Sequence, residues 1–145
     1  LLGGFARVGG TGEIIRPLPG APALSLLLIQ PRESLSTKTV FERLKGCPPG
    51  ESADLPGTAE ALRQRSWQQL FRFARNQLQQ AAVSLCPAVQ EALFDLYAQN
   101  AAFAQMSGAG SLVYGVFQDA AGARRAAENL KNKWDTCLSA QTVPF

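Results

Sequence analysis

The pattern of apolar and polar residues begins with a turn-rich stretch and continues into a buried strand. Residues 1–22 are rich in glycine and proline, and short apolar pieces at Val8 and at residues 14–15 predict a weak hairpin. Residues 23–30 form an almost continuous apolar run that stops at Pro31, which is typical of a buried strand. The hairpin alone has too little apolar material for a core.

The middle of the chain has the 3.6-residue periodicity of helices. A helix is predicted at residues 36–45, with Ser36 as its N-cap and Gly46 as its stop. Residues 47–57 are rich in proline and glycine, so we expect a loop without regular structure. Residues 58–85 then form a long helical pattern, in one piece or two. One face of this pattern carries Trp67, Leu70, Phe71, Ala74 and Leu78.

The rest of the chain predicts a helix, two strands, a second helix and a final strand. The first helix begins at Pro87 and ends at Asn100, a residue suited to a left-handed C-cap. The later elements, in order, are strands at residues 102–106 and 112–118, a helix at 120–133 capped by Asp119, and a strand at 134–143. From the first buried strand onward, the order predicts an α+β fold with a ferredoxin-like β-α-β-β-α-β core and inserted helices.

Composition narrows the classes of function. The chain has 145 residues, 46% of them hydrophobic, which fits one globular domain. A net charge of +3 suits an anionic ligand but is far from the signature of a nucleic-acid-binding protein. The sequence contains no histidine, so it excludes Ser-His and Cys-His nucleophile systems within this chain.

The cysteines and the apolar runs bear on the compartment. Cys47, Cys86 and Cys137 are widely spaced and odd in number, which argues against a disulfide framework or a zinc site and fits a reducing compartment. No apolar run approaches the roughly 20 residues of a membrane span. We therefore expect a cytoplasmic protein with no membrane partner.

The segment with most chemical information is the glycine-rich loop at residues 107–111. Gly108 and Gly110 allow positive φ angles and a close approach of backbone amides to an anion, and the hydroxyls of Ser107 and Ser111 offer further donors. The same glycines also suit a tight turn between two strands, and spacing alone leaves both readings open. The loop lacks the Gly-Lys-Ser/Thr ending of a P-loop.

The full run MSGAGSLVYGVF at residues 106–117 resembles the third glycine-rich motif of the GHMP kinases. The stretches GGFARVGGTGE at residues 3–13 and SLSTKTVF at residues 34–41 resemble the same family, in the same order. The NQLQ stretch, at residues 76–79, stands where part of that family has N-D-L-E. Glutamines at positions 77 and 79 thus replace two acidic residues, which puts any charge-dependent role there in doubt.

The resemblance implies a fold, a reaction and a set of binding residues. Members of the family have two domains with the site between them, and the part of the family that is most similar implies ATP- and Mg²⁺-dependent phosphorylation of a cytidyl-bearing small molecule in isoprenoid precursor synthesis. The phosphate loop then comprises Ser107, Gly108, Ala109, Gly110 and Ser111. Thr37 and Phe41 match the stretch that forms the cytidine pocket. Without the resemblance, packing in the core is the simpler reading of Phe41.

The family's ATP-cradling loop, and the segment that supplies its lysine and catalytic aspartate, have no counterpart in this sequence. We therefore interpret residues 1–22 as the trailing hairpin of a missing N-terminal kinase domain, which would be this chain's partner, and residues 23–145 as the GHMP kinase C-terminal domain. We expect no catalytic residue in this chain, no activity from it alone, and no ATP or Mg²⁺ bound by it alone.

Three alternatives remain open at this stage. The first is another GHMP kinase, acting on homoserine, mevalonate or a sugar. The second is a stand-alone ferredoxin-like binding module, which predicts a polar surface over the hairpin. The third is nucleic-acid binding through the arginines of residues 63–75, although Arg65 and Arg72 fall opposite the apolar face, as in an ordinary solvated helix.

Overall fold

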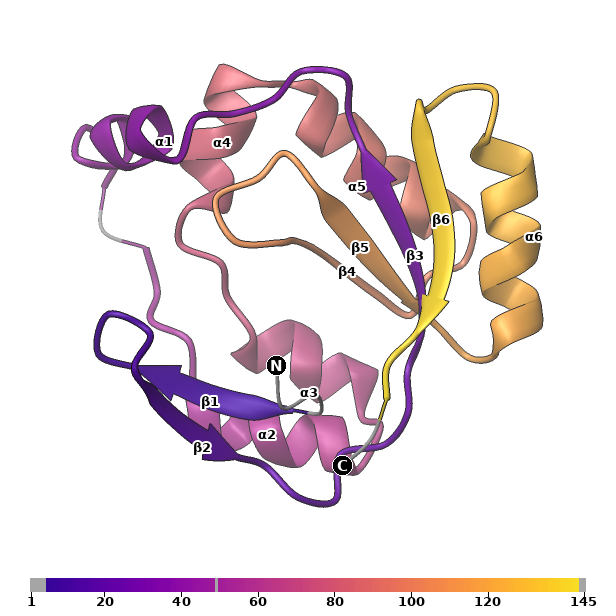
Figure 1. Cartoon of the computed structure of the whole chain (residues 1–145), viewed down its shortest axis with the longest axis horizontal. Coiled ribbons are helices and arrows are strands. Elements are labelled where there is room, and N and C mark those ends of the chain that lie inside the picture. The colour runs from indigo at the N-terminus through magenta and orange to yellow at the C-terminus, as the bar shows by residue number, and fades with distance from the viewer. Residues whose placement is uncertain (1–4, 49, 144–145) are drawn as a thin grey trace.

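The computed structural model describes residues 5–48 and 50–143, and its centre is a four-stranded antiparallel sheet. The strands lie in the order β4-β5-β3-β6, which confirms the predicted ferredoxin-like arrangement (Figure 1). Their bounds are Ser25–Gln30 for β3, Phe103–Met106 for β4, Val113–Phe117 for β5 and Thr136–Gln141 for β6.

Two helices cover one face of this sheet, as the apolar periodicity predicts. They are α5 (Ala88–Ala98) and α6 (Ala120–Leu130), seen behind and beside the sheet in Figure 1. Along β3, alternate residues are buried, and Leu27 and Ile29 face the main core together with Leu96. The central strand is thus anchored on the helix face.

The inserted helices differ from the predicted pattern. Residues 58–85 contain parts of three helices: α2 (Leu55–Arg63), α3 (Trp67–Phe73) and α4 (Gln79–Leu85). The first break lies at Arg65, whose φ of 51° ends the helical geometry. The loop prediction for residues 47–57 is wrong at its end, because the Asp54 carboxylate accepts a hydrogen bond from the Gly57 amide and starts α2 early.

A smaller apolar cluster forms on the other face of the sheet, where α2 and α3 pack. It joins Leu24 of the segment before β3 to Leu70 of α3 and to Phe103 and Val116 of the sheet. The prediction that Phe71 faces inward is wrong, since its side chain is 62% exposed. With α3 only seven residues long, Leu70 supplies the buried contact and Phe71 points outward.

The remaining elements are a hairpin near the start of the chain and the helix that follows β3. Strands β1 (Ala6–Gly9) and β2 (Ile14–Pro17) pair antiparallel and lie beside α2 and α3 (Figure 1). Helix α1 spans Thr37–Leu44. The motif glycines at positions 3 and 4 lie outside the described residues. Among the helices that the structure describes, none has the length and apolarity needed to cross a membrane.

Candidate functional site

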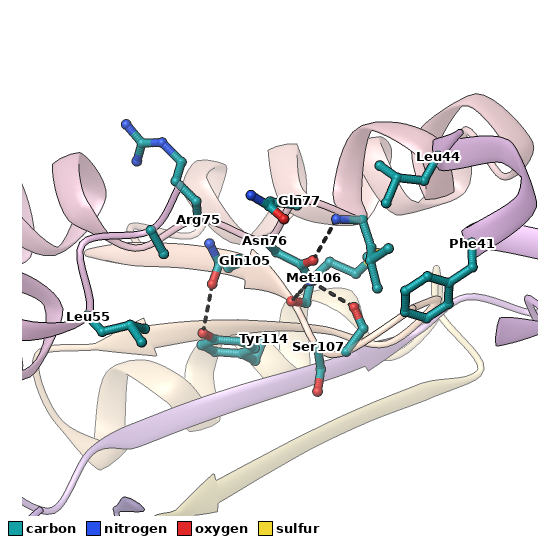
Figure 2. A pocket seen from close by; sticks show the side chains of 13 residues that line it. Phe41, Leu44, Leu55, Arg75, Asn76, Gln77, Gln105, Met106, Ser107 and Tyr114 are labelled. Carbon is teal, nitrogen blue, oxygen red and sulfur yellow. Dashed lines mark hydrogen bonds between the residues drawn. The ribbon is translucent and has the colours of Figure 1, made fainter. Parts of the chain in front are cut away.

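A wide cleft of about 720 Å³ lies between α1, the segment that joins α3 to α4, and the end of β4 (Figure 2). Its lining includes Phe41, Leu44, Arg75, Asn76, Ser107 and Gly108. Residues separated by more than 60 positions thus meet at one surface. The structure brings Ser107 and Gly108 of the predicted phosphate loop and the predicted cytidine-pocket residue Phe41 to the same cleft, whereas Ala109, Gly110 and Ser111 are not among the residues that line it.

The glycine-rich loop connects β4 to β5 and starts with a tight turn in which the Gly110 amide donates to the Ser107 carbonyl at 3.0 Å. Gly108 has a φ of 55° and Gly110 a φ of 91°, both favourable for glycine. A Cβ at Gly110 would lie 2.8 Å from the Met106 sulfur, whereas a Cβ at Gly108 would meet nothing within 4 Å. Packing therefore requires glycine at position 110, and position 108 stays open.

The backbone amides of this loop divide into those that are hydrogen-bonded within the described chain and those that are not. The Ser107 amide donates to the Leu112 carbonyl at 2.8 Å, and the Gly110 amide is used in the turn. Within the described part of the chain, the amides of Gly108 and Ala109 have no protein acceptor. Consecutive free amides in a glycine turn form the kind of concavity that binds an anion.

The two serines of the loop have different surroundings. Ser107 is exposed and lines the cleft. The side chain of Ser111 is buried. Its hydroxyl donates to the backbone carbonyl of Glu33 at 2.6 Å and accepts from the side-chain amide of Gln30 at 2.6 Å. The Ser111 hydroxyl, expected as a ligand donor, instead ties the loop to the segment between β3 and α1.

Asn76 and Gln79 hold the other side of the loop, a role for which no physical pattern in the sequence singles them out. The Asn76 amide donates to the carbonyls of Met106 and Gly108, at 2.9 and 2.8 Å. The Gln79 side-chain oxygen accepts from the Met106 amide at 3.0 Å. A glutamate, the family residue at position 79, would accept the same bond, so this departure preserves the contact.

The two predicted pocket residues of α1 lie on one exposed side of the helix. The Phe41 ring is 50% exposed at the cleft, while its neighbour Val40 is fully buried in the core. Core packing therefore does not account for Phe41. Thr37, one turn earlier, is exposed but is not among the residues that line the cleft.

Among the residues that line the cleft, Arg75 is charged, and five more have polar side chains: Asn76, Gln77, Gln105, Ser107 and Tyr114. The Arg75 guanidinium donates to the Phe71 carbonyl at 2.6 Å and lies 3.4 Å from the Glu51 carboxylate. Tyr114 donates to the side-chain oxygen of Gln105 at 3.4 Å, and burial raises the pKa of its phenol. Among the described residues, no group of three or more cysteine or acidic side chains is arranged to hold a metal ion.

Comparison with known proteins places the chain beside one group of kinases. The family described as GHMP kinases C terminal matches residues 58–136. The 4-diphosphocytidyl-2-C-methyl-D-erythritol kinase of Lachnoclostridium phytofermentans is 33% identical over 126 residues, which cover 87% of this chain and 43% of the relative. The enzyme of the same name from Paracoccus denitrificans is 37% identical over 124 residues, which cover 83% of this chain and 43% of the relative.

A solved structure agrees with these relatives. The crystal structure of a 4-(cytidine 5'-diphospho)-2C-methyl-D-erythritol kinase superposes with a TM-score of 0.75 at 26% identity, covering 94% of this chain and 48% of the other. The chain thus spans less than half the length of each of these proteins.

Proposed function

This chain belongs to the GHMP kinase C-terminal family, and we propose that it forms the C-terminal part of a kinase that phosphorylates 4-diphosphocytidyl-2-C-methyl-D-erythritol with ATP. The observation that carries the proposal is the cleft that Ser107 and Gly108 of the glycine-rich loop line together with the exposed ring of Phe41. The similarity to two kinases with this substrate in their names supports the same choice over homoserine, mevalonate or a sugar.

We assign the phosphate end of the ligands to the glycine-rich loop. The amides of Gly108 and Ala109, with the Ser107 hydroxyl, donate to phosphate oxygens, and Gly110 lets the chain turn tightly enough to present them. Ser111 contributes by fixing the end of the loop. Phosphoryl transfer depends mainly on positioning and on neutralising phosphate charge, which is what such a loop supplies.

We assign the cytidine end to α1. The exposed ring of Phe41 stacks on the pyrimidine, a contact worth about 1 to 3 kcal/mol. Thr37 lies four residues earlier on the same side of the helix, so its hydroxyl reaches the same nucleotide. Phe41 lines the same cleft as Ser107 and Gly108 of the loop, as a substrate that carries both a base and phosphates requires.

The remaining machinery belongs, in this proposal, to an N-terminal domain that is the partner of this chain. That domain supplies the ATP-cradling loop, the lysine, the aspartate and the groups that hold Mg²⁺. Residues 1–22 are the end of that domain, and the exposed side chains of Val8, Ile14 and Ile15 on the hairpin suit packing against it. Residues 23–145 form the C-terminal domain, and the three thiols fit a cytoplasmic enzyme.

The experiment that tests the proposal compares the complete kinase with the 145-residue chain. Each is incubated with ATP, Mg²⁺ and, in separate reactions, the cytidyl substrate, homoserine and mevalonate. We expect the complete kinase to phosphorylate only the cytidyl substrate, and the 145-residue chain to phosphorylate none. Turnover of homoserine or mevalonate in preference to the cytidyl substrate would reject the assigned substrate. Turnover by the 145-residue chain alone would reject the assignment of the catalytic residues to the N-terminal domain.

A further inference from the structure

On the outer edge of β4, side chains form hydrogen bonds with the backbone groups that face away from β5. In the described structure, the Tyr97 hydroxyl bonds both the amide and the carbonyl of Ala104, and Gln79 and Asn76 take the amide and the carbonyl of Met106. Edge strands with free backbone groups pair readily with strands of other molecules. Here the side-chain hydrogen bonds occupy the backbone groups of Ala104 and Met106, so they are not free for such pairing. Asn76 differs from the other two, because its amide also reaches past the strand to the Gly108 carbonyl in the loop.

The bond to Gly108 controls the direction of a free loop amide. The peptide between Gly108 and Ala109 is planar and trans, so its carbonyl and its N–H point in opposite directions. Asn76 holds that carbonyl at 2.8 Å. It therefore sets the direction of the Ala109 N–H, one of the loop amides with no acceptor in the described chain.

The side-chain amide of asparagine is well suited to this position. Its nitrogen has two N–H groups, one for each of the two carbonyls, while its oxygen accepts from the Leu78 amide at 3.0 Å at the start of α4. An aspartate has the same shape and keeps the bond to Leu78. It has no donors, however, and places a negative oxygen against the carbonyls of Met106 and Gly108.

We infer that Asn76 is the positioning residue of the phosphate loop: it holds the Gly108–Ala109 peptide so that the Ala109 amide is set to donate to a phosphate. The inference rests on the proposed function for its catalytic consequence, but the orientation of the peptide is testable without it. Asn76 is expected to act through the loop and to leave the cytidine contact at Phe41 unchanged, since it makes no hydrogen bond to α1 within the described residues.

The first arm of the test uses the 145-residue chain and requires no activity. We expect Asn76→Asp to move the Ala109 amide resonance and to lower its NMR order parameter, because the Gly108–Ala109 peptide loses the contact that holds it. The matched control is Gln80→Glu, the same amide-to-carboxylate change on an exposed position of α4. Asn76→Ala, which removes the donors without adding charge, provides the same readout if the aspartate variant does not fold. An Ala109 resonance and order parameter equal to wild type in the folded variant would overturn the inference.

The second arm measures kinetics in the complete kinase. Asn76→Asp is expected to lower kcat by about 10- to 100-fold, the cost typical of a misplaced positioning group, with KM for the cytidyl substrate within about twofold. Gln80→Glu should stay within about twofold in both constants. A merely structural role predicts a lower Tm with kcat per folded molecule unchanged, and that result would also overturn the inference. A wild-type kinase without cytidyl activity would reject the proposed function, while the first arm would still decide the position of the loop.

Discussion

Val40 and Phe41 are neighbours in the sequence with opposite surroundings. Val40 is fully buried between α1 and the core, whereas half of the Phe41 ring is exposed at the cleft. Leaving an aromatic ring in water forgoes the free energy of its burial, about 2 kcal/mol for a side chain of this size. We propose that the ring of Phe41, which lines the cleft beside the proposed phosphate loop, is exposed in order to contact a ligand.

Phe41→Ala tests that explanation. We expect binding of the cytidyl substrate to the complete kinase to weaken by about 1 to 3 kcal/mol, because the base loses its stacking partner. Thermal stability should change little, since the ring contributes little to the core. Phe94→Ala is the matched control, because Phe94 is 64% exposed on α5 and does not line the cleft. Equal substrate affinities for the two variants would count against the assignment of Phe41.

Gly110 is the loop residue with the strictest packing requirement. In Gly110→Ala, the new methyl group would lie 2.8 Å from the Met106 sulfur, and φ would stay at 91°. We expect the free energy of unfolding to fall by about 2 kcal/mol or more in urea titrations. Gly50→Ala is the control, because that position has open space and ordinary φ, and it should be nearly neutral. A neutral Gly110→Ala would show that the turn relaxes more easily than its contacts indicate.

The raised pKa of the Tyr114 phenol predicts a loss of stability at alkaline pH. Burial raises the pKa of its phenol in the folded state above the usual 10.0, so the folded chain keeps a proton that the unfolded chain loses. The stability that the protonated Tyr114 phenol contributes is fully present below pH 10. It is lost as the pH rises through the raised pKa of the folded state. Tyr114→Phe should therefore make the decline of unfolding free energy above pH 10 shallower than in wild type. Identical slopes for the two proteins would contradict this.

The roles of Ser111 and Asn76 show where residue-level prediction from the sequence stops. The glycine loop was recognisable from its own letters, since glycines and serines in a short turn indicate an anion site or a tight reversal. Ser111, however, bonds groups 78 and 81 positions away, and Asn76 bonds a carbonyl 32 positions away. Such contacts follow from the folded topology, and no local pattern encodes them.

At the scale of elements, helix starts divide into those with and without a side-chain cap. Asp119 accepts from the Gly122 amide at 2.7 Å at the start of α6, whereas Ser36 makes no such bond at the start of α1. We expect Asp119→Ala to lower the free energy of unfolding by about 1 kcal/mol, and Ser36→Ala to be close to neutral. Chemical denaturation of both variants checks the difference. A larger loss for Ser36→Ala would contradict the capping geometry described for α1.

The sequence predicted elements well where a local signal and the tertiary contacts agree. Residues 25–30 were apolar enough to require burial, and Asn100 has the left-handed φ of 66° expected of a helix C-cap. The inserted helices were less predictable. The helix breaks at Arg65, which has a φ of 51° and whose side chain donates to the carbonyl of Ala23. Because this contact is distant in the sequence, the apolar periodicity did not reveal the break.

At the scale of the whole molecule, the fold connects the two halves of the proposed site. The glycine loop is tied on one side to α4 through Asn76 and on the other to the segment before α1 through Ser111. Helix α1 also packs against α4. The proposed phosphate loop and the proposed cytidine residues therefore rest on one connected support, which we expect to keep their separation constant when substrate binds.

The most direct measurement is a crystal structure of the complete kinase with 4-diphosphocytidyl-2-C-methyl-D-erythritol and a non-hydrolysable ATP analogue. We predict the cytosine ring stacked on Phe41 and phosphate oxygens within hydrogen-bond distance of the amides of Gly108 and Ala109. Ligands bound with neither contact, at a surface away from this cleft, would contradict the account.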